Sequence, residues 1–277
     1  MVAVPPPAPP ARPIPARPVS GGPRRFASLR TVTALVLREM STRYGRTPGG
    51  YLWAIAEPLG AIIVLSIGFS LVLRTPSLGT SFLLFYATGY LAFSLYNTVA
   101  NTTARAINFS KPLLKYPAVT WIDAVLARFL LTSLTGIVIA IVLLSGILAV
   151  VDSHTTIDMV PVVEAFALAM LLGLGVGTTN CALMGLFPLW DVAWSIITRP
   201  LFLASAIIYI YEDLPPLAKE VLWYNPLIHI TGLMRRGFYS TYTAAHLTPL
   251  YTLFWGLAFL ALGLLLLGRY HREILNR

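Results

Sequence analysis

The stretch that decides the fold is residues 250–268, LYTLFWGLAFLALGLLLLG, which contains no charged residue. A helix that spans a bilayer needs roughly 20 apolar residues. Arg269 and Arg272 follow the run directly, as expected where a helix leaves the hydrocarbon for the headgroup region. This stretch therefore predicts a transmembrane helix near the end of the chain.

Five further apolar runs precede it, separated by short polar segments. They are Leu52 to Leu73, Phe82 to Asn101, Val125 to Val151, Pro161 to Phe187 and Val192 to Tyr211. The 277 residues are 57% hydrophobic and only 11% charged, with a mean hydropathy of +0.74, whereas about a quarter of the residues of a soluble domain are charged. This composition excludes an ordinary soluble protein. The fold class we predict is an all-α integral membrane protein with six transmembrane helices.

Two segments with different properties precede the first run. Residues 1–23 are rich in Pro, Ala and Arg, so we expect a disordered cytoplasmic tail. Arg24 to Tyr44 has helical periodicity, with Leu35 outside the apolar arc. The arc comprises Phe26, Leu29, Val32, Val36, Leu37, Met40 and Tyr44. An amphipathic, basic helix of this kind is expected to lie in the headgroup plane.

The basic residues divide unequally when they are assigned alternately to the two sides of the six spans. Sixteen of the twenty fall on the side of the termini, and only Arg74, Lys219, Arg235 and Arg236 fall on the other. By the positive-inside rule, both termini are cytoplasmic. The net charge of +9 is thereby explained without nucleic-acid binding.

The stretch between Glu212 and Pro249 is too long for a tight turn and too apolar for a solvated loop. Two short helices at, or re-entering, the outer leaflet fit it. Because irregular backbone at membrane depth needs protein or a water-filled cavity around it, we expect a cavity on the periplasmic side.

Motifs for a cofactor or a metal ion are not found in the sequence. There is no phosphate-binding Gly-x-x-x-x-Gly-Lys-Ser/Thr loop, so no ATP site of that type is expected in this chain. Gly173, Gly175 and Gly177 lie within a span, where small residues let helices approach closely. The four histidines and the single cysteine show no metal-ligand spacing.

Two features leave alternatives open. Glu57, which precedes Pro58, has two interpretations. Its carboxylate either stabilises the start of a helix, or it lines a cavity or pairs with Arg43 or Arg46. The loop from Thr102 to Asp123 mixes basic and apolar residues, so it either anchors at the membrane surface or docks into a groove on a partner protein.

Four sequence blocks carry a resemblance to a known family. They are REMSTRYGRTPGGYLWAIAEP (38–58), NFSKPLLKYP (108–117), RPLF (199–202) and NPLIHITGLMRRGF (225–238). In order and spacing the chain from residue 38 onward resembles the membrane subunits of ABC-2 type polysaccharide exporters, and most closely the capsular polysaccharide export permeases of Gram-negative bacteria.

The resemblance implies a transmembrane domain over residues 24–277, in an inner-membrane homodimer with a polysaccharide tunnel between the protomers. Two copies of a separate subunit would bind ATP and Mg²⁺, while this chain would hold no cofactor. A lipid-linked polysaccharide would be the substrate, with a periplasmic copolymerase and an outer-membrane export protein as further partners. An amphipathic interface helix, a cytoplasmic coupling helix after the second span and two short periplasmic helices before the last span are also implied.

Site residues follow from the same resemblance. A contact with the ATPase is implied for Arg105, Asn108, Phe109, Lys111, Leu113, Leu114 and Lys115. A place on the substrate path is implied for Arg43, Arg46, Tyr51, Trp53, Glu57, Trp223, Tyr224, Arg235 and Arg236. Aromatic faces suit sliding sugars, although an interfacial aromatic belt would equally explain the tyrosines and tryptophans.

Three functions remain open at the level of sequence. The leading hypothesis is a permease for capsular polysaccharide. An exporter of O-antigen or teichoic acid would share this architecture, and an integral-membrane enzyme acting on lipid-linked sugars is less favoured because carboxylates and histidines are sparse in the loops.

Overall fold

The computed structural model describes residues 27–44, 49–114, 116, 119–151 and 156–276. The predicted tail therefore lies outside the described residues. All regular elements in the described ranges are helical, as predicted. They are α1 (Ala27–Tyr44), α2 (Gly50–Ser70), α3 (Phe82–Ala104), α4 (Ala106–Ser110), α5 (Trp121–Val150), α6 (Met159–Leu186), α7 (Trp190–Ala204), the 3₁₀ turn η1 (Tyr211–Asp213), α8 (Pro216–Leu222), α9 (Pro226–Phe238) and α10 (Pro249–Asn276).

Local sequence signals account for several helix starts. Thr120 and Asp123 form a reciprocal capping box at the start of α5, in which Asp123 Oδ2 accepts from Thr120 N at 3.0 Å. Asp158 caps α6. At α9, the Asn225 side chain accepts from the backbone N–H of Leu227, and Pro226 occupies the first turn.

Four helices are long and apolar enough to cross a membrane: α2 over Leu52–Ser70, α5, α6 and α10. The other two predicted spans differ from these. α3 has 23 residues and is therefore about 34 Å long, but it carries many polar side chains. α7 has only 15 residues, about 22 Å, so the predicted helix through Tyr211 is wrong at its end.

The premature end of α7 has a local cause. After Ala204 the chain turns, with Ala206 at a positive φ of 54°, a conformation uncommon outside glycine. Ala206 and Ile207 are nevertheless buried. An apolar run can therefore be buried as irregular backbone as well as helix, and hydropathy does not distinguish the two.

Helices α3 and α6 form the centre of the bundle, and glycines let them pack closely. A Cβ on Gly173 would lie 2.9 Å from the carbonyl oxygen of Tyr96, and one on Gly177 would lie 2.8 Å from that of Ala100, both in α3. Gly175 faces α10 instead, where a Cβ would lie 2.5 Å from the carbonyl oxygen of Gly256. The predicted packing role of these glycines is confirmed.

Helix α1 lies beside α5, and its buried face differs from the predicted arc. Val32 and Leu35 pack with Ala127 of α5, while Leu29 and Leu37 are more than 60% exposed. Leu35, which interrupts the apolar arc in the sequence, thus faces the protein. The predicted arc placed all apolar residues of α1 on one face. In the structure, some of the apolar residues pack against α5 and others lie on the exposed side, away from α5.

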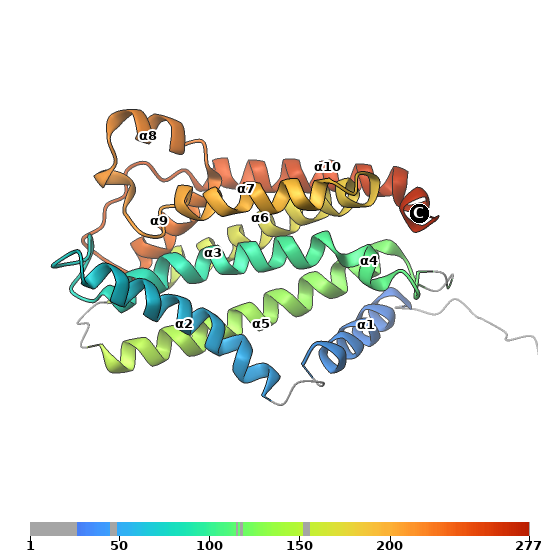
Figure 1. The fold of residues 1–277 in the computed structure, drawn as a ribbon, viewed down its shortest axis with the longest axis horizontal. Helices are drawn as coiled ribbons and strands as arrows, with labels where there is room; N and C mark the ends of the chain where they lie inside the picture. Colours follow the sequence, from blue (N-terminus) through green and yellow to red (C-terminus); the bar gives the residue numbers. More distant parts are fainter. Residues whose placement is uncertain (1–26, 45–48, 115, 117–118, 152–155, 277) are drawn as a thin grey trace, which may run out of the picture.

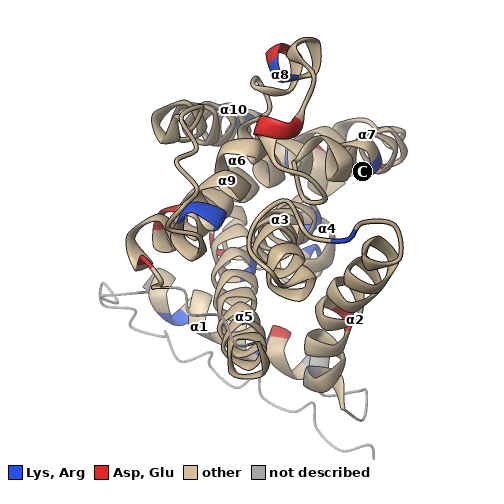
Figure 2. Cartoon of the chain, turned by 90° about the vertical axis from the view of Figure 1, so that its left-hand side faces the viewer, with Lys and Arg blue, Asp and Glu red and all other residues tan. Residues whose placement is uncertain are grey.

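The long helices run between two ends of the bundle (Figure 1). One end holds α4, α1 and the C-terminus, and the other holds η1, α8 and α9, which we call the α4 end and the α9 end. Figure 2 looks onto the α9 end, where η1 and α8 carry acidic and basic residues outside the bundle. The two short helices expected before the last span are α8 and α9.

Candidate functional site

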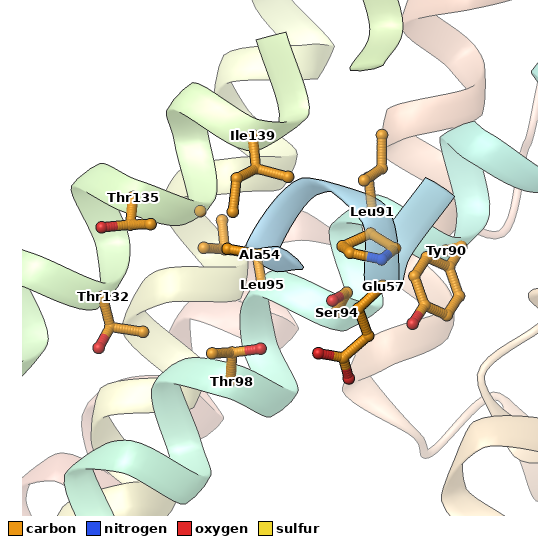
Figure 3. Close-up of a pocket in the computed structure, with 12 residues that line it drawn as sticks. Ala54, Glu57, Tyr90, Leu91, Ser94, Leu95, Thr98, Thr132, Thr135 and Ile139 are labelled. Carbon is orange, nitrogen blue, oxygen red and sulfur yellow. The ribbon is translucent and has the colours of Figure 1, made fainter. Parts of the chain in front are cut away.

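A polar pocket lies between α2, α3 and α5 (Figure 3), with a volume of about 130 Å³. Its polar lining is one carboxylate and a set of hydroxyl groups. The lining residues are Ala54, Glu57, Pro58, Tyr90, Leu91, Ser94, Leu95, Thr98, Thr132, Thr135, Gly136 and Ile139. A pocket of this size with several polar partners has room for water or part of a polar ligand.

The spacing of the polar residues explains why they meet. Tyr90, Ser94 and Thr98 recur every four residues on α3 and therefore share one face. Thr132 and Thr135 face them from α5. The neighbouring Thr102 Oγ1 lies 3.2 Å from Thr132 Oγ1, which joins the two helices just beyond the pocket.

Glu57 belongs to the pocket and not to a helix start. Helix α2 begins at Gly50, so Glu57 lies two turns inside it and the helix-start interpretation is wrong. Figure 3 shows the carboxylate beside Ser94 and Thr98. The cavity-lining alternative is the one that the structure supports.

The remaining residues predicted for the mouth of the path are described only in part. Trp53 is 74% exposed on α2. Arg43 lies in α1 and Tyr51 in α2, but their side chains, and the whole of Arg46, lie outside the described residues. These positions stay predictions.

At the α4 end, the predicted coupling segment forms the five-residue helix α4 followed by a turn. Asn108 and Phe109 are exposed and border a groove of about 580 Å³. The groove is lined by Arg105, Asn108, Phe109, Arg128, Met184, Pro188 and Asp191. An exposed ion pair of 3.2 Å between Arg105 and Asp191 crosses it.

The two leucines of the same segment are half-buried within the chain. Leu113 packs against the cluster of Val32, Leu35 and Ala127. Leu114 packs against a second cluster that includes Ile107. Lys111 is half-buried, and Lys115 lies outside the described residues. Asn108 and Phe109 are therefore the better candidates for contact with a partner.

A buried ion pair lies close to this groove and was not foreseen from the sequence. Arg128 Nε of α5 lies 3.0 Å from Glu39 Oε1 of α1, with both side chains about 10% exposed. Arg128 also donates to the carbonyl oxygen of Thr102 at 3.1 Å. Its guanidinium lies 4.1 Å from the centroid of the Phe109 ring. Because 89 residues separate Glu39 from Arg128, local spacing gives no signal for the pair.

Arg235 at the α9 end is a structural group. It is 1% exposed and donates to the carbonyl oxygens of Ile207 and Tyr209 at 2.7 and 2.6 Å. Its guanidinium lies 4.2 Å from the Phe85 ring centroid. Burial lowers its pKa to about 10. Arg235 thus holds the irregular segment after α7 and does not line an open surface.

Arg236, Trp223 and Tyr224 border open space at the same end. Arg236 lines a groove of about 630 Å³ together with Thr156, Asp158, Ser240 and Thr243. Trp223 and Tyr224 line a second groove of about 670 Å³ with Tyr211, Lys219 and Glu220. These positions remain candidates for the exit of the path.

At the α9 end, His246 contacts η1. In the sequence the histidines are isolated from one another, so this contact was not predicted. Its Nδ1 lies 3.0 Å from Glu212 Oε1, and its ring stacks on Tyr211 with centroids 4.1 Å apart. Glu212 accepts a second hydrogen bond from Tyr242 at 2.8 Å. Burial lowers the pKa of His246, and the Glu212 carboxylate opposes that shift.

His229 lies nearby and is neutral. Its Nε2 lies 3.0 Å from the carbonyl oxygen of Trp223, and the backbone N–H of Thr248 donates to its Nδ1 at 3.3 Å. One ring nitrogen therefore donates and the other accepts. Burial lowers the pKa of His229 to about 4. No group of three or more His, Cys, Asp or Glu residues in the described ranges is placed to hold a metal ion.

Comparison with known proteins gives a family match over most of the chain. The model of the ABC-2 type transporter family matches residues 30–239, which include the polar pocket, α4 and α9. The chain belongs to the ABC-2 type transporter family.

Individual relatives match a longer part of the chain than the family model does. This ABC-2 permease is 28% identical over 236 residues to the polysialic acid transport protein KpsM of Escherichia coli, covering 85% of this chain and 92% of that protein. It is 24% identical over 245 residues to the capsule polysaccharide export inner-membrane protein CtrC of Neisseria meningitidis serogroup B, and 25% identical over 246 residues to BexB of Haemophilus influenzae. In both cases 88% of this chain and 92% of the relative are covered.

Membership in this family settles the class of protein. ABC-2 permeases are membrane transport subunits that work with an ATPase subunit, and the relatives are named as transport and export proteins. The hypothesis of a membrane enzyme is therefore not carried further. The predicted family resemblance is confirmed.

Proposed function

We propose that this permease is the membrane subunit of an ATP-driven exporter that moves lipid-linked capsular polysaccharide from the cytoplasm to the periplasm. The observation that carries the proposal is similarity to three capsule or polysialic acid export proteins over 85–88% of the chain. The hydroxyl-lined pocket supports it, since sugar hydroxyls exchange hydrogen bonds with Ser, Thr and carboxylate groups.

In this proposal, six helices cross the inner membrane. The four apolar helices are joined by α3 and by α7 with the buried segment that follows it. Because α3 lies at the centre of the bundle, its polar side chains need not face lipid. The α4 end carries most of the basic residues, which supports a cytoplasmic location for that end and both termini.

The polymer is proposed to pass between two copies of the chain, alongside α2. Leu52, Trp53 and Val64 of this helix are each more than 70% exposed, so this face is available to a second copy and to the substrate. Glu57 follows Trp53 by one helical turn and precedes Val64 by two, so it shares their exposed face of α2 while also lining the hydroxyl-rich pocket. Trp53 and Tyr51 would contact sugar faces, and Arg43 and Arg46 would hold an anionic group at the mouth.

The ATPase subunit, which uses ATP and Mg²⁺, is proposed to dock at α4. Asn108 and Phe109 are exposed there beside an open groove, which favours the docking alternative for this segment over anchoring at the membrane surface. At the opposite end, Trp223, Tyr224 and Arg236 are proposed to border the exit, where a periplasmic copolymerase and an outer-membrane export protein would receive the polymer.

Deleting the gene in its native host tests this function. Surface polysaccharide and cytoplasmic lipid-linked polymer are measured in the deletion strain and after complementation with the wild-type gene. The expected result is loss of surface polymer together with trapped lipid-linked polymer. Unchanged surface polymer, or loss of polymer synthesis with nothing trapped, would contradict the proposal.

An exporter of O-antigen or teichoic acid is the alternative of the same architecture. The sugar composition of the trapped polymer decides between them. A capsule-type polymer supports the proposal, whereas a polymer with O-antigen repeats or polyol phosphate would replace it with the alternative.

A further inference from the structure

We propose that Phe109, Arg128 and Glu39 form a mechanical link that carries displacement of α4 into α5 and α1. The proposal rests on the proposed docking of an ATPase at α4. It concerns a chain of three side chains on three different elements, each in contact with the next.

The first contact joins α4 to α5. Phe109 is 42% exposed, so part of its ring borders the groove at the α4 end. Its face is covered by the Arg128 guanidinium, 4.1 Å from the ring centroid. Such a cation–π contact follows the ring when the ring moves. Arg38 of α1 approaches the same ring at 5.8 Å, so both neighbouring helices contact this one side chain.

The second contact joins α5 to α1. Glu39 and Arg128 are each less than 9% exposed as whole residues, and their charged groups are 3.0 Å apart. Arg128 is also fixed to the Thr102 carbonyl at the end of α3. A buried ion pair adds little to stability compared with apolar side chains of the same size. Its position at the junction of α1, α3, α4 and α5 therefore points to a role beyond stability.

Burial of the pair makes the proposal testable. Because Glu39 and Arg128 are covered by this chain, neither can offer much surface to an ATPase subunit. Any effect of their substitution on the use of ATP must therefore pass through the protein. Removing one partner leaves an unpaired buried charge, whereas removing both restores an apolar interior.

The experiment uses the full permease reconstituted in liposomes with its own ATPase subunit and lipid-linked polymer. Polymer transported per ATP hydrolysed and thermal stability are measured for Glu39→Leu, Arg128→Met and the double variant. We expect the double variant to keep ATPase binding and near wild-type stability, but to transport about tenfold less polymer per ATP. Arg30→Gln removes an exposed charge from the same helix α1 and is expected to leave the ratio unchanged.

The outcomes separate the link from simple packing. If the double variant recovers both stability and the wild-type ratio, the pair is only structural and the proposal is overturned. If the single variants fail to fold, the transport ratio of the double variant still distinguishes the link from a purely structural pair. If the wild-type complex itself binds no ATPase or moves no polymer, the proposed function fails instead of the link.

Discussion

At the scale of single residues, both arginines that the described part of the fold buries are bound to backbone carbonyl oxygens. Arg235 donates to two carbonyl groups of the segment after α7, where the backbone has no helical hydrogen-bond partners. A buried carbonyl without a donor costs about 1–3 kcal/mol. One arginine therefore allows an irregular segment to be packed against the centre of the bundle.

His229 makes stability depend on pH. Its Nδ1 accepts from Thr248 and its Nε2 faces the Trp223 carbonyl, with the His246 ring 6.2 Å and the Tyr251 ring 5.5 Å away. The folded-state pKa of about 4 lies below the ordinary histidine value of 6.5. As pH falls below the unfolded value, the unfolded chain binds a proton that the folded chain does not, so stability is lost.

We expect the free energy of unfolding in detergent to fall by about 1 kcal/mol between pH 7.5 and pH 5.5 through His229. Thermal unfolding followed at a series of pH values measures it. His229→Gln is expected to be less stable at neutral pH but to show a shallower pH dependence. An unchanged slope in this variant would assign the pH dependence to other groups, His246 with Glu212 first among them.

At the scale of helices, close approach is set by the glycines on α6. Gly177→Val would place side-chain atoms against the Ala100 carbonyl and the Thr103 side chain of α3. Since backbone cannot move aside as a flexible side chain does, we expect overpacking to lower the free energy of unfolding by about 1–3 kcal/mol or more.

The matched control for this substitution is Gly146→Val on α5, where a Cβ meets nothing within 4 Å. Thermal unfolding of both purified variants gives the comparison. Equal Tm values for the two variants would show that α3 and α6 are not in the close contact described.

The helices also show how far sequence reasoning reaches. The predicted bounds of α3 and α6 and the predicted start of α10 agree closely with the structure, because apolar runs are local signals, whereas α10 continues beyond the predicted end at Gly268 to Asn276. α7 was predicted too long because Ala206 turns the chain within an apolar run. The face of α1 was misplaced because α5, and not only lipid, decides which side is buried.

The same distinction between local sequence signals and tertiary packing applies to the candidate site. Glu57 attracts notice in the sequence because a carboxylate in an apolar run is costly. Its hydroxyl neighbours come from two other helices, and only the fold brings them together. The ion pair of Glu39 and Arg128 is likewise a product of tertiary packing, so no local sequence motif predicts it.

At the scale of the whole molecule, the two ends of the bundle are proposed to face opposite compartments. Cys181, the one cysteine in the sequence, is buried, so a Cys181→Ala background carries new cysteines without interference. Asn108 marks the α4 end, and Ala245 is exposed at the α9 end.

Labelling with a membrane-impermeant maleimide tests this orientation. In cells whose outer membrane is permeabilised, we expect Ala245→Cys to react and Asn108→Cys to react only after the inner membrane is disrupted. The inverse pattern would place α4 in the periplasm and remove the proposed ATPase contact.

The shortness of α4 has a consequence for biosynthesis. Five residues are too few to hold a helix in isolation, so α4 depends on its neighbours. Ala106 and Ile107 are packed in one cluster with Leu267 and Ile274 of α10, which is synthesised long after α4. The surface around α4 is therefore completed only after α10 has been synthesised and has packed against it. A permease whose α10 is missing or not inserted would lack that surface, and assembly with the ATPase would then select for chains in which α10 is in place.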